Sequence, residues 1–233
     1  MLGTIVNFFA IIAGSILGLL IKKRLKSSYT TITITGLGLA VLFVGIGTAL
    51  KGMFDPQAHS TLFIFSLVIG GLLGEMVDLD GKMHTFGDFL QRKLSSGESA
   101  FSQGFVTASL LYCVGAMAII GAINDGAFGK PEILFAKSTL DGITSIMLAA
   151  TYGLGVLFSA FMVLFYQGVI TILASIIVTY LTPDMFREIS IVGGALIFAI
   201  GLNMLELKKI KTANFLPALF VPIAYYLLLP LWP

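Results

Sequence analysis

The chain has few charged residues, few histidines and a single cysteine. Asp, Glu, Lys and Arg make up 11% of its 233 positions, whereas about 25% is usual for a soluble domain. The lone Cys113 excludes an intramolecular disulfide and, without a partner, offers no metal cluster. His59 and His84 also lack a partner at metal-binding spacing. We therefore expect neither a metal nor a cofactor.

Motifs of hydrolases and ATP-driven pumps are missing as well. There is no glycine-rich phosphate loop, no Gly-x-Ser-x-Gly elbow and no His-Glu-x-x-His pair. The net charge of +2 gives no indication of a nucleic-acid partner. The nine methionines form no Met-x-x-Met ladder, so copper transport has no support. We expect a protein that is not an enzyme.

Apolar residues dominate the sequence instead. Hydrophobic residues occupy 57% of the positions, and the mean hydropathy is +0.99. No charged residue occurs from Ile143 to Leu181. Because about 20 apolar residues already cross a bilayer, a run of this length must contain two spans and a tight reversal. The composition predicts an all-α, polytopic helical bundle in a lipid bilayer.

Hydropathy and turn signals predict about eight transmembrane helices in one domain, 1–233. They are expected at about 2–21, 32–50, 61–77, 104–123, 139–157, 165–181, 189–205 and 215–229. The first apolar run is not interpreted as a signal peptide, because its basic cluster follows it. Ser138 and Asp141 have the spacing of a capping box, which predicts a helix start near Thr139. Pro217 and Pro222 predict a kink in the last span.

Lys and Arg are distributed unevenly between alternate loops. Ten fall on one side of the predicted bundle, namely Lys22, Lys23, Arg24, Lys26, Lys82, Arg92, Lys93, Lys208, Lys209 and Lys211. Four fall on the other side, namely Lys51, Lys130, Lys137 and Arg187. Because cytoplasmic loops are the basic ones, both termini are expected outside a bacterial plasma (inner) membrane. An amphipathic segment at about 83–95 is expected to lie on the membrane surface.

Two patterns concern helix packing. Ala10, Gly14 and Gly18 form a row of small residues, which suits a homodimer interface or a contact inside the chain. LAVLFVGIGTALKG at 39–52 is similar to GALIFAIGLNMLELKK at 194–209. This pairs the second and third spans with the seventh and eighth, in opposite directions, as in the inverted repeats of transporters. A chance likeness between two Gly- and Leu-rich helices explains the pattern equally well.

The central stretch carries a family resemblance. CVGAMAIIGAINDG, LFAKSTLDGITSIMLAATYGLGVLFSA and YQG, together with the opening LGTIVNFFAIIAGSILGLLIKKRL, resemble domain-of-unknown-function family 554. These are the YqgA-like bacterial integral membrane proteins, and the likeness covers nearly the whole chain. The resemblance implies a membrane protein. It implies no catalytic residues, because none is established in the family.

Ionisable side chains inside spans are candidate functional residues, because they are costly in a bilayer. Asp141 lies one helical turn from Lys137 and from Ser145, and it could coordinate a ligand or accept a proton at the mouth of a cavity. The alternative is a carboxylate near a helix N-terminus, favoured by the helix dipole and paired with the lysine. Asp125, in an Asn-Asp-Gly sequence, is expected in a loop.

Three uncharged amides complete the candidate set: Asn7, Gln167 and Asn203. They could form a midplane site for a cation or small solute, or interhelical hydrogen bonds worth about 0.6 to 2 kcal/mol. Glu75 and Glu206 are expected to pair with lysines of the basic loops. We expect a transporter or channel-like permease for a small ion or solute. The alternative is a non-transporting scaffold or partner subunit whose polar residues are structural.

Overall fold

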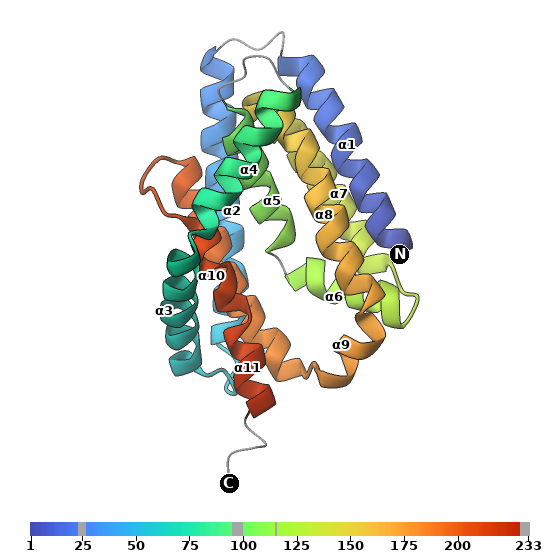
Figure 1. The fold of residues 1–233 in the computed structure, drawn as a ribbon, viewed down its shortest axis with the longest axis vertical. Coiled ribbons are helices and arrows are strands. Elements are labelled where there is room, and N and C mark those ends of the chain that lie inside the picture. Colours follow the sequence, from blue (N-terminus) through green and yellow to red (C-terminus); the bar gives the residue numbers. More distant parts are fainter. Residues whose placement is uncertain (23–26, 95–99, 115, 229–233) are drawn as a thin grey trace.

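The protein is a bundle of helices, as the composition predicts (Figure 1). The computed structural model describes residues 1–22, 27–94, 100–114 and 116–228, and it contains no strand among them. The elements are α1 (Leu2–Lys22), α2 (Ser27–Met53), α3 (Ser60–Val77), α4 (Leu79–Leu94), α5 (Phe101–Cys113), α6 (Ala116–Ala127), α7 (Glu132–Tyr152), α8 (Leu154–Ile172), α9 (Ala174–Tyr180), α10 (Pro183–Met204), the 3₁₀ helix η1 (Thr212–Leu219) and α11 (Val221–Leu228).

Six of the described helices are long and apolar enough to cross a membrane: α1, α2, α3, α7, α8 and α10. A seventh span arises if α5 and α6 count as one, although the two are bent by 59°. The predicted single span at 104–123 is therefore two helices. The prediction of eight spans is not confirmed, because η1 and α11 form only a shorter apolar segment. Pro217 lies inside η1, at the predicted distortion.

The reversal inside the long apolar run lies earlier than predicted. It occurs at Gly153, whose φ of 85° and ψ of −149° favour a residue without Cβ, and α8 begins at the next residue. The capping-box prediction is wrong, because α7 begins at Glu132, and the Ser138 hydroxyl donates to the Leu134 carbonyl inside the helix. The predicted span at 165–181 covers the end of α8 and all of α9.

Helices α1 and α7 run parallel, in contact along their length. Gly3 lies against Leu134, Gly14 against the Gly142 carbonyl and Gly18 against the Ile146 carbonyl. A Cβ atom at Gly14 or Gly18 would clash with the backbone of α7. The small-residue row on α1 is therefore a contact inside the chain and gives no argument for a homodimer.

Helices α2 and α10 pack antiparallel and carry the two similar segments. A Cβ on Gly45 would lie 2.8 Å from the Gly194 carbonyl oxygen, and a Cβ on Gly194 would lie 2.8 Å from the Gly45 carbonyl oxygen. Gly201 packs in the same way against Leu42. Close helix packing thus requires glycine in both segments, which explains their likeness without a repeat. An inverted repeat is not confirmed.

The amphipathic segment forms α4, which begins at Leu79 rather than near residue 83. It crosses the outside of the bundle near the ends of α1 and α2 (Figure 1). Gly87 of α4 contacts Ser102 of α5, and the Phe86 ring lies 5.8 Å from the Phe105 ring. Helix α5 also packs on α7, α8 and α10, and buried apolar residues of these four helices form most of the hydrophobic core.

Candidate functional site

Three predicted residues from three helices meet in the core. Asn7 of α1 donates its Nδ2 to Asp141 Oδ2 of α7 at 3.0 Å and to Gln167 Oε1 of α8 at 3.3 Å. Asn7 and Gln167 are fully buried, and Asp141 is 7% exposed. We call Asn7, Asp141, Gln167 and the neighbouring Lys137 the amide–carboxylate cluster. The cluster joins three helices that are each able to cross a membrane.

Lys137 neutralises the carboxylate. Its Nζ lies 2.6 Å from Asp141 Oδ2, and both side chains are buried. The Lys137 ammonium also lies 5.9 Å from the centre of the Tyr112 ring. The count of Lys and Arg in alternate loops treated Lys137 as a loop residue. In the structure it lies inside helix α7 instead. An isolated buried charge is very costly, so pairing is what permits these two groups at this depth.

The position of Asp141 in α7 excludes the helix-dipole explanation. The favourable effect of a helix N-terminus on a carboxylate falls off within the first turn. Because α7 begins at Glu132, Asp141 lies well beyond that turn. The Lys137–Asp141 pair, one turn apart, is as predicted. Its location is the interior of a span, not an entrance at the helix start.

Two buried amide atoms of the cluster have no hydrogen-bond partner among the described residues. They are Asn7 Oδ1, an acceptor, and Gln167 Nε2, a donor. Leaving such a group unpaired in a protein interior costs about 1 to 3 kcal/mol. Buried polar groups in folded proteins are nearly always paired with protein, water or ligand. These two atoms are therefore the chemically unsatisfied part of the cluster.

Hydroxyl pairs border the cluster along the bundle. On the side of the N-terminus, Thr4 Oγ1 and Thr171 Oγ1 share a hydrogen bond of 3.1 Å. On the opposite side, Ser145 Oγ donates to the Asp141 carbonyl at 2.7 Å and shares a hydrogen bond of 2.9 Å with Tyr112 OH. All four hydroxyl residues are buried. Ser145 therefore contacts the cluster through the backbone of Asp141, rather than through its carboxylate.

The sequence comparisons can now be set beside this geometry. The family described as "Protein of unknown function (DUF554)" matches residues 2–227. The chain belongs to that family.

Two bacterial proteins are similar to this chain over nearly its whole length. The "Uncharacterized membrane protein YdfK" of Bacillus subtilis (strain 168) is 39% identical over 222 residues, which cover 95% of this chain and 94% of the relative. The "Uncharacterized protein YqgA" of Escherichia coli (strain K12) is 30% identical over 225 residues, which cover 94% of each chain. No solved structure matches. Together with the apolar helices, the comparisons establish a membrane protein.

The predicted site residue Asn203 lies apart from the cluster of this DUF554 protein. Its Nδ2 donates to the Ile210 carbonyl, and its Oδ1 accepts from the Ile210 N–H, both at 2.7 Å. The amide thus closes the loop between α10 and η1, rather than forming the interhelical hydrogen bond that was the alternative for this residue. Asn203 also lines a polar cavity of about 660 Å³ beside Asp80, Glu206 and Lys209.

Glu75, at the end of α3, pairs with a lysine as predicted. Lys211 Nζ lies 2.6 Å from Glu75 Oε1, and the Asn214 amide donates to the same carboxylate. The hydrogen bond with Glu75 raises the pKa of Lys211. The pair is more than half exposed, so it fastens the loop to the end of α3 with only a small effect on stability.

Asp125 is not the loop residue that its Asn-Asp-Gly sequence predicts. It lies in α6, is buried, and accepts the Gly3 N–H at 2.9 Å. Its Oδ2 also lies 3.0 Å from the amino group of Met1. A carboxylate at a helix N-terminus is stabilised by the unpaired N–H groups there. Asp125 therefore anchors the start of α1.

Sequence reasoning missed Glu188, which is among the most buried charged residues of the described chain. Glu188 lies in the second turn of α10, where its Oε1 accepts the His59 N–H at 2.9 Å at the start of α3. Its Oε2 has no hydrogen-bond partner among the residues that the structure describes. The sequence from Thr182 to Glu188 predicts a turn, so Glu188 was not considered as a residue inside a helix. The available signal is a glutamate directly before an apolar helical run.

No group of three or more His, Cys, Asp or Glu residues in the described part of the chain is arranged to hold a metal ion. The chemistry of the amide–carboxylate cluster is instead that of paired charge and amide hydrogen bonding. Such a cluster can bind water, a proton or a small polar species.

Proposed function

We propose that this membrane protein is a permease for a small ion or polar solute, and not an enzyme. The observation that carries the proposal is the amide–carboxylate cluster, because a charged pair and two unpaired amide atoms lie between membrane-spanning helices. Polar and charged side chains inside a membrane have a high free-energy cost, and they typically mark the pathway of a substrate or ion.

The cluster supplies complementary chemistry for a small substrate. Asn7 Oδ1 can accept a hydrogen bond, and Gln167 Nε2 can donate one. A small solute or a hydrated cation satisfies both atoms. Lys137 keeps Asp141 neutralised when no cation is bound. A cation that reaches the carboxylate therefore competes with the lysine ammonium, whereas a neutral solute leaves the ion pair in place.

The structure corresponds, in this proposal, to a closed conformation. The Thr4–Thr171 pair closes one side of the cluster, and the Tyr112–Ser145 pair closes the other. Passage requires the two sides to open in turn, as in alternating access. The bend between α5 and α6 supports such movement, because Tyr112 lies directly before it.

The orientation is part of the same proposal. Lys211 is bound to Glu75 at the end of α3, close to the start of α4. Gly155, just after the end of α7, lies against Phe101 at the start of α5. In Figure 1 the ends of α1 and α7 lie at the top, and the α3–α4 junction lies lower, on the left. We place the side of the bundle that carries Lys22 and Lys211 in the bacterial cytoplasm, which puts the N-terminus outside the plasma membrane.

The rival function is a scaffold or partner subunit. The same hydrogen bonds join α1, α7 and α8, and a purely structural role requires nothing more of them. Under this alternative, removing the charge of Asp141 changes stability but no flux.

The test is transport by the full chain in liposomes. Sodium, potassium, protons, chloride and urea are offered as probes, and uptake is compared with empty liposomes. Asp141→Asn is expected to slow the flux about tenfold, or about 1.4 kcal/mol in the barrier. Asp125→Asn removes another buried carboxylate outside the cluster, and it should retain flux even if it lowers thermal stability. Equal flux in both variants, or none with the wild type, contradicts the proposal.

A further inference from the structure

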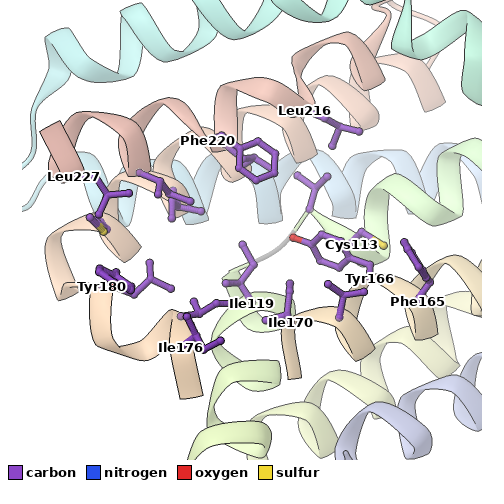
Figure 2. A pocket seen from close by; sticks show the side chains of 18 residues that line it. Cys113, Ile119, Phe165, Tyr166, Ile170, Ile176, Tyr180, Leu216, Phe220 and Leu227 are labelled. Atoms are coloured by element: carbon purple, nitrogen blue, oxygen red, sulfur yellow. The ribbon is translucent and has the colours of Figure 1, made fainter. Parts of the chain in front are cut away.

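A second feature, separate from the proposed permease site, is a cavity of about 650 Å³ (Figure 2). Helices α8 and α9 form one wall, and α10, η1 and α11 form the opposite wall. Cys113 at the end of α5 and Ile119 of α6 line it from the centre of the bundle. Figure 2 shows Cys113 and Tyr166 near one end and Tyr180 and Leu227 near the other.

The walls of this cavity present only apolar surface. Among the eighteen lining side chains, only Cys113, Tyr166 and Tyr180 contain a polar atom. A space of this size would hold about 20 water molecules, at about 30 Å³ each, and each water needs two to four polar partners. The cavity cannot supply them, so water is a poor occupant. An apolar molecule gains dispersion contacts with every wall.

The location of the cavity indicates which apolar molecule can enter it. Two of its walls belong to α8 and α10, which are long enough to cross a membrane. Phe165, Ile176, Tyr180 and Phe220 line it and are each at least 60% exposed. In a bilayer, these exposed apolar side chains face hydrocarbon. Lipid therefore enters sideways without crossing a polar barrier.

We propose that the cavity binds one acyl chain of a bilayer phospholipid. The chain lies between α8–α9 and η1–α11, with its inner end near Cys113 and Tyr166. Tyr180, at the end of α9, presents an aromatic ring with a hydroxyl, which is the residue type favoured at the headgroup level. The headgroup thus lies on the side of the α9–α10 turn. The acyl chain fills the space that the described residues leave open between α8–α9 and η1–α11.

Native mass spectrometry of the full chain tests this proposal. The protein is released from nanodiscs of phosphatidylethanolamine and phosphatidylglycerol, and we expect one phospholipid to remain bound per chain. Ile119→Trp places an indole in the cavity and should lower the retained fraction about tenfold. Val169→Phe narrows the cavity from α8, so the test does not depend on one variant folding.

Ile64→Trp is the matched control. Ile64 lies on α3, is 58% exposed and does not line the cavity, so this variant should retain lipid like the wild type. A wild-type chain that emerges without lipid overturns the proposal, and so does equal retention in all variants. A lipid-free dimer that Ile119→Trp converts to monomer would assign the cavity to a second copy instead.

Cys113 offers an independent readout because it is the only cysteine and lines the cavity. An acyl chain beside its sulfur should slow modification by N-ethylmaleimide in detergent. Delipidated protein is expected to react faster, and adding phospholipid back should restore the slow rate. Equal rates with and without phospholipid contradict an acyl chain at this end.

Discussion

Asn7 donates its amide to Asp141 across 134 positions of sequence, and the bond lies in the interior of a bundle of membrane-spanning helices. The same amide reaches Gln167 on a third helix. One small side chain thus joins α1, α7 and α8 at a single depth. The buried Lys137–Asp141 ion pair lies beside it, so charged and amide groups are gathered at this one junction of the described core.

The first prediction is energetic coupling within the cluster. Asn7→Ala removes a donor from a buried carboxylate and should lower the free energy of unfolding by about 1 to 3 kcal/mol. A double-mutant cycle with Gln167→Ala should give a coupling energy of about 0.5 kcal/mol or more. Reversible unfolding in mixed detergent micelles measures both quantities.

Thr144→Ala is the control for that cycle. Its exposed hydroxyl donates to the Leu140 carbonyl of its own helix, so the effect should stay within about 0.5 kcal/mol. A coupling energy indistinguishable from zero would show that the two amides act separately.

The second prediction concerns the close contact of α1 with α7. Gly14→Val places a branched side chain against the Gly142 carbonyl and should prevent stable packing of the two helices. Gly47→Val is matched to it, because an added Cβ there meets nothing within 4 Å. Fluorescence-detected size exclusion after heating should show early aggregation only for Gly14→Val. Equal melting of both variants would contradict the packing argument.

The third prediction is the orientation in the membrane. In a Cys113→Ser background, single cysteines at Gln57 and Lys130 should react with an impermeant maleimide added to intact cells. Cysteines at Lys82 and Lys209 should react only after lysis. All four positions are exposed in the folded chain, so access depends on the side of the membrane. The reverse pattern overturns the proposed orientation.

Some errors of the sequence interpretation share one cause, namely the absence of local signals. The reversal at Gly153 lies in a run without charge or proline, where several glycines are equally plausible turns. Asn203 and Gln167 look alike as amides in apolar spans. Only their neighbours differ, because Asn203 bonds to the loop at Ile210 whereas Gln167 accepts from Asn7.

Composition and hydropathy are enough to predict the membrane environment and the helices, because a long apolar run in a bilayer must satisfy its backbone hydrogen bonds within a helix. The sequence also marked Asn7, Asp141 and Gln167, since a polar residue stands out in an apolar span. The tertiary structure alone decided which of the marked residues share a site. That choice depends on which helix backbones approach closely through glycine, as at Gly14 and Gly142. Such long-range pairing has no trace in local periodicity.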